Sequence, residues 1–234
     1  MNIAGFVPLS LCDYPGRVAA VVFTQGCNFR CPFCHNAHLM PLLPSTGNVL
    51  EEEQVLARIA EHRTRLGGVV ISGGEPTLQR DLPGFLLRLK TLGLAVKLDT
   101  NGSQPEALRH VLDERLVDFI AMDVKAPWEH YPRLTGTACA PDDLTQSVRL
   151  IAGSGLPHQF RTTRVDLLLT DSDYRNVLAQ IPDGSPHVWQ AFRPEHCFDP
   201  TLRPPAPHSP APVTPGNPTA TKERSSSRVV RSSQ

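Results

Sequence analysis

Apolar and polar positions along residues 1–200 form short apolar runs that alternate with stretches of helical spacing. The runs are rich in β-branched residues and short enough to predict buried strands. They lie at residues 17–25, 69–72, 94–98, 117–122, 159–165 and 187–192. Between them, apolar residues at helical spacing predict helices at 51–66, 81–89, 142–152 and 171–180, and one that begins at Pro105.

This alternation predicts an α/β fold, because strands joined by helices form a parallel sheet through right-handed crossovers. Six such units within about 190 residues are too few for a closed eight-stranded barrel, which needs roughly 250 residues. An open, doubly wound sheet and an incomplete barrel both fit the pattern. In either fold, ligands bind at the carboxyl ends of the strands.

Residues that could bind a cofactor or take part in catalysis follow four successive predicted strands. Residues 27–34 contain three cysteines and follow the first strand, and Gly73, Gly74 and Glu75 follow the second. Residues 99–102 follow the third strand, and residues 123–125 close the fourth. Since the carboxyl ends of parallel strands share one edge of the sheet, these residues are expected to form one site.

Composition divides the chain into a core and a tail. The 234 residues hold 23 basic and 23 acidic side chains, and this balance gives no support to a nucleic-acid or membrane-surface protein. Residues 201–234 contain five basic residues, one acid, seven prolines and no aromatic residue. Such a segment buries too little apolar area to fold. We therefore expect a folded domain at 1–200 and a disordered basic tail at 201–234.

The chain shows neither a targeting signal nor a membrane segment. Its first residues lack a basic region followed by an apolar stretch and a cleavage site. No run approaches the roughly 18 apolar residues of a spanning helix. The sequence thus predicts a soluble, cytoplasmic protein.

Three of the six cysteines lie close together, with the spacing C-x3-C-x2-C at Cys27, Cys31 and Cys34. Three thiolates leave one iron of a [4Fe–4S] cluster free to bind a small chelating molecule, and this interpretation is favoured. Structural zinc is the alternative, with His35 or His38 as a fourth ligand. The remaining cysteines are isolated and are expected to be ordinary thiols.

The cysteine motif, with Phe33 before its last cysteine and His35 after it, resembles the signature of the radical S-adenosylmethionine (SAM) superfamily. Residues 72–77 resemble that superfamily's Gly-Gly-Glu motif. Within the superfamily, the chain is most similar to glycyl-radical-enzyme activases, especially those of anaerobic ribonucleoside-triphosphate reductase. The matching stretches are residues 5–8, 13–16, 23–28, 97–102, 122–125 and 190–194. The resemblance covers about residues 3–200 and implies an incomplete (β/α)6 barrel.

The resemblance assigns the cluster and SAM to particular residues. It implies that Cys27, Cys31 and Cys34 hold one cluster, whose fourth iron binds the amine and carboxylate of SAM. Glu75 would accept a hydrogen bond from that amine, and Gly73 and Gly74 would allow close backbone approach. The adenine side of the cofactor would contact Phe33 and His35.

A cation site is implied beside the SAM carboxylate. Asp99, Thr100 and Asp123 match positions that bind a monovalent cation in related activases, while Lys125 would balance charge and Asn101 belongs to the same cofactor-binding stretch. From the residues alone, the two aspartates could be turn acids, but their placement at adjacent strand ends favours a site role. Arg161 and Arg164 on the fifth predicted strand are further candidates, although a strand arginine is more often a surface residue.

The implied activity is radical chemistry on a protein. An electron from flavodoxin or ferredoxin would cleave SAM to methionine and a 5′-deoxyadenosyl radical, which takes hydrogen from a glycine of anaerobic ribonucleotide reductase. Oxygen would destroy the cluster, so function is expected to be anaerobic. No second cysteine-rich block lies between Cys34 and Glu51, which predicts a single cluster. The alternatives are a small-molecule radical enzyme similar to 7-carboxy-7-deazaguanine synthase and a non-catalytic zinc or iron–sulfur protein.

Overall fold

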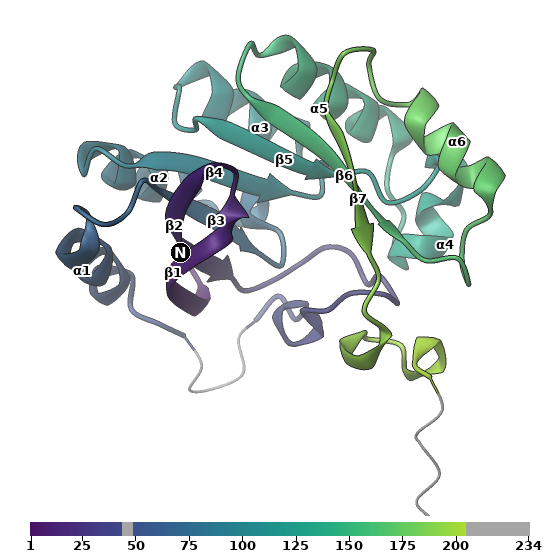
Figure 1. Ribbon diagram of the computed structural model, residues 1–234, viewed down its shortest axis with the longest axis horizontal. Helices are drawn as coiled ribbons and strands as arrows, with labels where there is room; N and C mark the ends of the chain where they lie inside the picture. The colour runs from purple at the N-terminus through teal and green to yellow at the C-terminus, as the bar shows by residue number, and fades with distance from the viewer. Residues whose placement is uncertain (44–48, 205–234) are drawn as a thin grey trace, which may run out of the picture. The chain divides into compact units, whose positions relative to one another are not determined.

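The computed structural model describes residues 1–43 and 49–204 (Figure 1). Most of the expected tail, residues 205–234, lies outside the described residues. Residues 201–204 belong instead to the compact unit that begins at Met1. Within them the side chain of Leu202 is buried, so the packed part of the chain extends past residue 200.

The described residues form one seven-stranded sheet with the strand order β1 to β7. β1 (Ile3–Tyr14) is antiparallel to β2 (Arg17–Thr24). The other strands run parallel to their neighbours and are β3 (Gly68–Gly73), β4 (Ala95–Thr100), β5 (Phe119–Asp123), β6 (His158–Arg164) and β7 (His187–Ala191). The sheet ends at β1 and β7 without pairing between them, which confirms the incomplete barrel.

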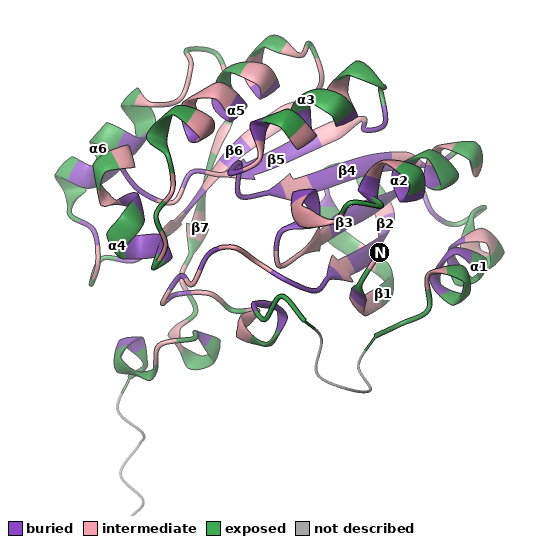
Figure 2. Cartoon of the chain, turned by 180° about the vertical axis from the view of Figure 1, so that it is seen from behind, coloured by how far each residue is buried: buried purple, intermediate pink, exposed green. Residues whose placement is uncertain are grey.

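Helices connect the parallel strands and cover one face of the curved sheet (Figure 1). They are α1 (Glu52–His62), α2 (Leu82–Thr91), α3 (Pro105–Asp113), α4 (Tyr131–Thr135), α5 (Pro141–Gly153) and α6 (Asp171–Ala179). Their apolar sides pack on the sheet, in which β2 to β5 are buried along most of their length and are purple in Figure 2. No helix within residues 1–43 and 49–204 has the length and hydropathy that crossing a membrane requires.

The predicted elements are found close to their expected bounds, but the sequence analysis did not predict β1. Most residues of β1 are exposed or half-buried, and its register against β2 shifts several times. A half-exposed edge strand with irregular pairing lacks both the apolar run of a central strand and the regular alternation of a surface strand. Pro8 weakens the strand pattern further. The short helix α4 was also not predicted.

Candidate active site

A cavity of about 230 Å³ lies at the carboxyl ends of the parallel strands. The structure brings into its wall all the residues that the resemblance assigns to the cluster, SAM and the cation: Cys27, Cys31, Phe33, Cys34, His35, Gly73, Gly74, Glu75, Asp99, Thr100, Asn101, Asp123 and Lys125. Six further residues complete the lining: Phe29, Asn36, Met40, Arg161, Thr163 and Gln190. His38 is not among the lining residues.

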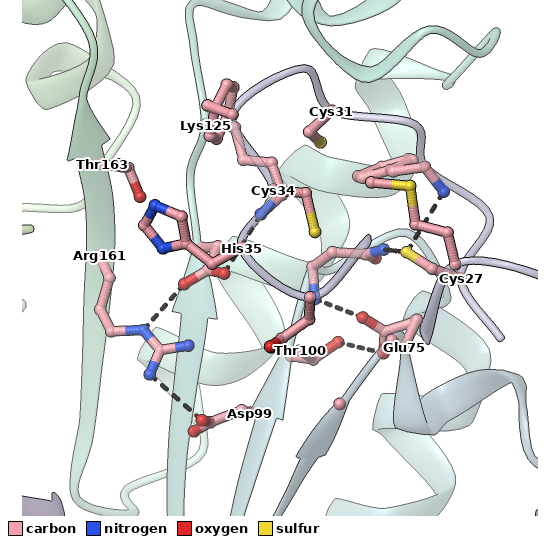
Figure 3. Close-up of a pocket in the computed structure, with 18 of the residues that line it drawn as sticks. Cys27, Cys31, Cys34, His35, Glu75, Asp99, Thr100, Lys125, Arg161 and Thr163 are labelled. Atoms are coloured by element: carbon pink, nitrogen blue, oxygen red, sulfur yellow. Dashed lines mark hydrogen bonds and ion pairs between the residues drawn. The ribbon is translucent and has the colours of Figure 1, made fainter. Parts of the chain in front are cut away.

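The cysteine loop is held in a compact shape by backbone hydrogen bonds. The amide of Cys34 donates to the carbonyl of Cys31 over 3.1 Å, and the amide of Phe29 donates to Cys27 Sγ over 3.4 Å. Arg30 fixes the start of the loop, because its Nη1 donates to the carbonyls of Cys27 and Phe29. The loop therefore presents all three thiols to the same cavity (Figure 3).

The segment after β7 braces this loop from outside. The amide of Phe198 donates to the carbonyl of Cys34 over 2.9 Å, and the amide of Asp199 donates to the carbonyl of Pro32 over 2.8 Å. Cys197 is fully buried beside these contacts. The end of the folded unit thus supports the turn that carries the last two pocket cysteines.

Burial favours the neutral form of the three pocket thiols. It raises the pKa of Cys31 to about 12, with the charge of Lys125 opposing the shift, and it also raises the pKa of Cys27 and Cys34. All three thiols are free of disulfides. Metal binding to such thiols requires their deprotonation.

Glu75 is fully buried and accepts hydrogen bonds from two neighbouring segments. Its Oε1 accepts from the Thr77 amide and hydroxyl and, over 2.8 Å, from the Thr100 hydroxyl. Its Oε2 accepts from the Asn101 amide over 2.6 Å. Burial raises the pKa of Glu75, and the hydrogen bonds from Thr77, Asn101 and Thr100 oppose that shift. Oε2, with a single recorded partner among the described residues, keeps acceptor capacity for a ligand.

Gly73 and Gly74 are required by the backbone of the chain itself. A Cβ atom at Gly74 would lie 2.1 Å from the carbonyl oxygen of Gly26, and one at Gly73 would lie 2.3 Å from the Thr24 amide nitrogen. Gly73 also has a φ of 119°, a conformation that favours glycine. The lack of a side chain at these glycines therefore lets the backbone of Thr24 and Gly26, which leads into the cysteine loop, pack closely against them.

Asn101 links the cysteine loop to the strand end that carries Thr100. Its Nδ2 donates to Asn28 Oδ1 over 2.9 Å, and its Oδ1 accepts from the Ser103 amide. Its backbone amide is the donor to Glu75. Asn101 consequently fixes the cysteine loop and the Gly-Gly-Glu turn relative to each other.

Five charged side chains of alternating sign form a chain of ion pairs at one side of the cavity, and all of them except Lys97 line it. They follow the order Lys97, Asp99, Arg161, Asp123 and Lys125 across β4, β5 and β6, and the close-up shows Arg161 beside Asp99 (Figure 3). Burial alone would raise the pKa of Asp123, but the adjacent charges of Arg161 and Lys125 lower it to about 2. With Lys97 included, this group of five side chains carries three positive and two negative charges.

His35 and Phe33 give the cavity an aromatic wall. The ring of His35 stacks on Phe192, with centroids 5.9 Å apart and an angle of 7° between the ring planes. Phe33 is buried on the same loop. Such a wall suits a flat aromatic group such as a nucleobase.

The family model of the radical SAM superfamily matches residues 21–181. The chain belongs to the radical SAM superfamily. It is 32% identical over 206 residues to the "Putative glycyl-radical enzyme activating enzyme" of Methanocaldococcus jannaschii, covering 84% of this chain and 82% of that relative. It is also 36% identical over 136 residues to the 7-carboxy-7-deazaguanine synthase of Hyperthermus butylicus, covering 53% of this chain and 56% of that relative.

Solved structures share the fold of this radical SAM chain. Streptococcus suis SuiB, bound to its precursor peptide SuiA, superposes with a TM-score of 0.59 at 13% sequence identity. The match covers 74% of this chain and 38% of SuiB, and it shows the common fold.

The pocket fits the cofactors of the superfamily, a [4Fe–4S] cluster and SAM. Three cysteines line it, so a four-iron cluster would keep one iron for SAM. Within the described residues, no three His, Cys, Asp or Glu side chains converge closely enough to hold one metal ion. A cuboidal cluster does not demand that convergence, since each thiolate binds a different iron.

Sequence reasoning left parts of this radical SAM site unassigned. Lys97 was not singled out, although Lys97 and Asp99 stand two residues apart on one strand and must share a face. Of the two arginine candidates, Arg161 reaches the cavity, whereas Arg164 is exposed and pairs with Asp166 and Asp171. Strand periodicity places these two arginines on opposite faces of β6, but it does not say which face meets the cavity.

Proposed function

We propose that this radical SAM enzyme is an activase that generates a glycyl radical on anaerobic ribonucleoside-triphosphate reductase. The observation that supports an activase is the similarity to the Methanocaldococcus jannaschii relative, which extends along most of both chains. The choice of reductase rests on the motifs at residues 5–8, 13–16, 97–102 and 190–194.

Each pocket residue has a task in this proposal. Cys27, Cys31 and Cys34 would hold the cluster, and Glu75 Oε2 would accept a hydrogen bond from the SAM amine. With an electron from flavodoxin or ferredoxin, these cofactors supply a 5′-deoxyadenosyl radical. The partner glycine would give up a hydrogen atom from its α-carbon, so that methionine and 5′-deoxyadenosine would be the products from SAM and the unpaired electron would remain on the partner.

The open side of the barrel supports a macromolecular substrate. Both outermost strands carry exposed apolar side chains, Leu9 and Leu11 on β1 and Val188 and Trp189 on β7. Exposed apolar groups at unpaired sheet edges are typical of surfaces that receive another chain. Leu9 and Leu11 lie beside the start of β2, so the partner loop that enters the cavity would approach instead from the carboxyl ends of the parallel strands.

A small-molecule radical enzyme is the second candidate, favoured by the Hyperthermus butylicus relative. Such an enzyme needs polar groups in the cavity beyond those that bind the cofactors. Thr163 and Gln190 are such groups, and the Thr163 hydroxyl lies 3.5 Å from Gln190 Oε1. The length of the match favours the activase instead. The Hyperthermus butylicus match spans about half of each chain, whereas the Methanocaldococcus jannaschii match spans most of both.

The test is anaerobic incubation of the reconstituted enzyme with dithionite, SAM and the candidate reductase. We expect a doublet electron paramagnetic resonance (EPR) signal on the reductase, with 5′-deoxyadenosine formed alongside it. A Cys31→Ala variant is the control and should give neither product. Formation of 5′-deoxyadenosine without the doublet would reject this reductase as the partner and leave the superfamily assignment intact.

A further inference from the structure

One arginine joins the two aspartates at the mouth of the cavity. Arg161 on β6 stands beside Asp123 of β5 in the register of the parallel strands, and Asp99 is the penultimate residue of β4, on the other side of β5. Arg161 Nε donates to Asp123 Oδ1 over 2.8 Å, and its Nη1 donates to Asp99 Oδ2 over 3.3 Å (Figure 3). The guanidinium thus occupies the space between the two carboxylates.

The remaining carboxylate oxygens are also paired. Lys97 Nζ donates to Asp99 Oδ1, and Lys125 Nζ donates to Asp123 Oδ2 over 3.2 Å. Each of the four oxygens therefore accepts from a cationic side chain. Three positive and two negative charges leave this group with one unbalanced positive charge beside the cofactor cavity.

These residues do not fit a bound metal cation. A monovalent cation between Asp99 and Asp123 would stand beside the positive charge of Arg161, whose guanidinium already contacts both carboxylates. Thr100, the third residue expected at a cation site, donates its hydroxyl to Glu75 instead. The guanidinium supplies the positive charge at this place, with a planar fork of donors suited to two carboxylates.

We propose that Arg161 is the built-in cation of the SAM site, so that SAM binding by this enzyme needs no added metal cation. Nη2 of Arg161 has no recorded hydrogen-bond partner within the described part of the chain, and the side chain lines the cavity. Its free N–H groups are thereby available to the SAM carboxylate. The proposal rests on the superfamily's SAM site and is independent of the identity of the protein partner.

The test measures the equilibrium affinity for SAM of the reconstituted enzyme, with no partner protein present. Binding is compared in sodium, potassium and tetramethylammonium chloride at one ionic strength, because tetramethylammonium is too bulky to enter a metal site. Wild-type affinity should agree within about twofold across the three salts. If SAM affinity were about tenfold or more higher in sodium or potassium chloride than in tetramethylammonium chloride, the proposal would be overturned.

Arg161→Gln removes the charge and keeps an amide donor. We expect SAM affinity to fall about tenfold or more in tetramethylammonium, the size of one lost charge-assisted hydrogen bond. Potassium or sodium should restore part of that affinity, since Asp99 and Asp123 become available to a metal ion. A purely structural role would not give this rescue, and unchanged affinity in Arg161→Gln would contradict the proposal.

Arg164→Gln is the matched control on the same strand. Arg164 is exposed and pairs with Asp166 and Asp171 outside the cavity, so its replacement should leave SAM affinity unchanged in every salt. Iron and sulfide content are measured for each variant. If Arg161→Gln fails to fold or to hold the cluster, the wild-type comparison across salts still decides the question.

Discussion

Cys31 is the most deeply buried of the three pocket cysteines, with 5% of its surface exposed. Its carbonyl accepts the hydrogen bond that closes the turn to Cys34. A thiol in this position is shielded from solvent and from disulfide exchange, which suits a permanent ligand better than a redox-active group. The burial that raises its pKa also excludes water from the metal centre it would ligate.

Replacing Cys31 by alanine is expected to abolish the cluster, because two thiolate ligands are too few to retain a four-iron cluster. Iron and sulfide content after anaerobic reconstitution, together with visible absorbance, measures this. Cys12→Ala is the control, since Cys12 is exposed on β1 and remote from the cavity lining. A Cys31→Ala protein with full iron and sulfide would refute the ligand assignment.

Gly74 is a position where a single methyl group has a predictable effect. Alanine there would collide with the Gly26 carbonyl, so we expect about 1–3 kcal/mol of destabilisation. Gly84→Ala is the matched control, because Gly84 lies in α2 with open space around its Cβ position and should gain about 0.5–1 kcal/mol. Thermal unfolding followed by circular dichroism compares them, and equal melting temperatures would contradict the packing argument.

The placement of single residues was easiest to predict where several candidates lie close together in the sequence. The C-x3-C-x2-C motif and the Gly-Gly-Glu turn are each contiguous, so their residues come together in any fold that keeps the strand ends aligned. The role of Arg161 was harder to predict, because its partners Asp99 and Asp123 are 62 and 38 residues away in sequence. Only the pairing of β4, β5 and β6 brings these three together.

At the level of elements, the cysteine loop depends on the chain that follows β7. Phe198 and Asp199 donate backbone hydrogen bonds to the loop, while Cys197 and Leu202 bury their side chains beneath them. Hydrogen bonds of this kind each contribute about 1 kcal/mol. The segment therefore supports the cysteine loop without lining the cavity itself.

Two truncated chains test this dependence. A chain that ends at Arg193 should lose most of its cluster and melt at a lower temperature, because both backbone contacts to the loop are gone. A chain that ends at Pro204 keeps these contacts and should match the full-length protein. Equal iron content in the two truncated proteins would show that the loop does not need this support.

The strands and helices were predicted accurately because their buried residues leave a clear apolar pattern in the sequence. The strands β2 to β5 are apolar runs covered on both faces, and such runs are visible in a single sequence. β1 was not predicted because its exposed residues and its register shifts against β2 produce no regular alternation of apolar and polar residues. Its place in the fold is set by pairing with β2, a long-range contact that local pattern does not encode.

At the largest scale, the described residues form a sheet that curves without closing. Alternation of strands and helices predicted the α/β class, and the number of units excluded a complete barrel, but an open doubly wound sheet was equally consistent with that pattern. The linear strand order and the concave site distinguish the incomplete barrel. Its unpaired edges leave one side accessible, which suits a substrate larger than a metabolite.

Transfer of a hydrogen atom from a partner glycine to the cofactor is the central claim, and isotope labelling tests it most directly. The enzyme is incubated with SAM, dithionite and a reductase whose glycines carry deuterium on the α-carbon. We predict deuterium in the 5′-deoxyadenosine and collapse of the EPR doublet, since the remaining α-hydrogen that splits the signal is replaced. Unlabelled 5′-deoxyadenosine, or a doublet that persists, would contradict the account.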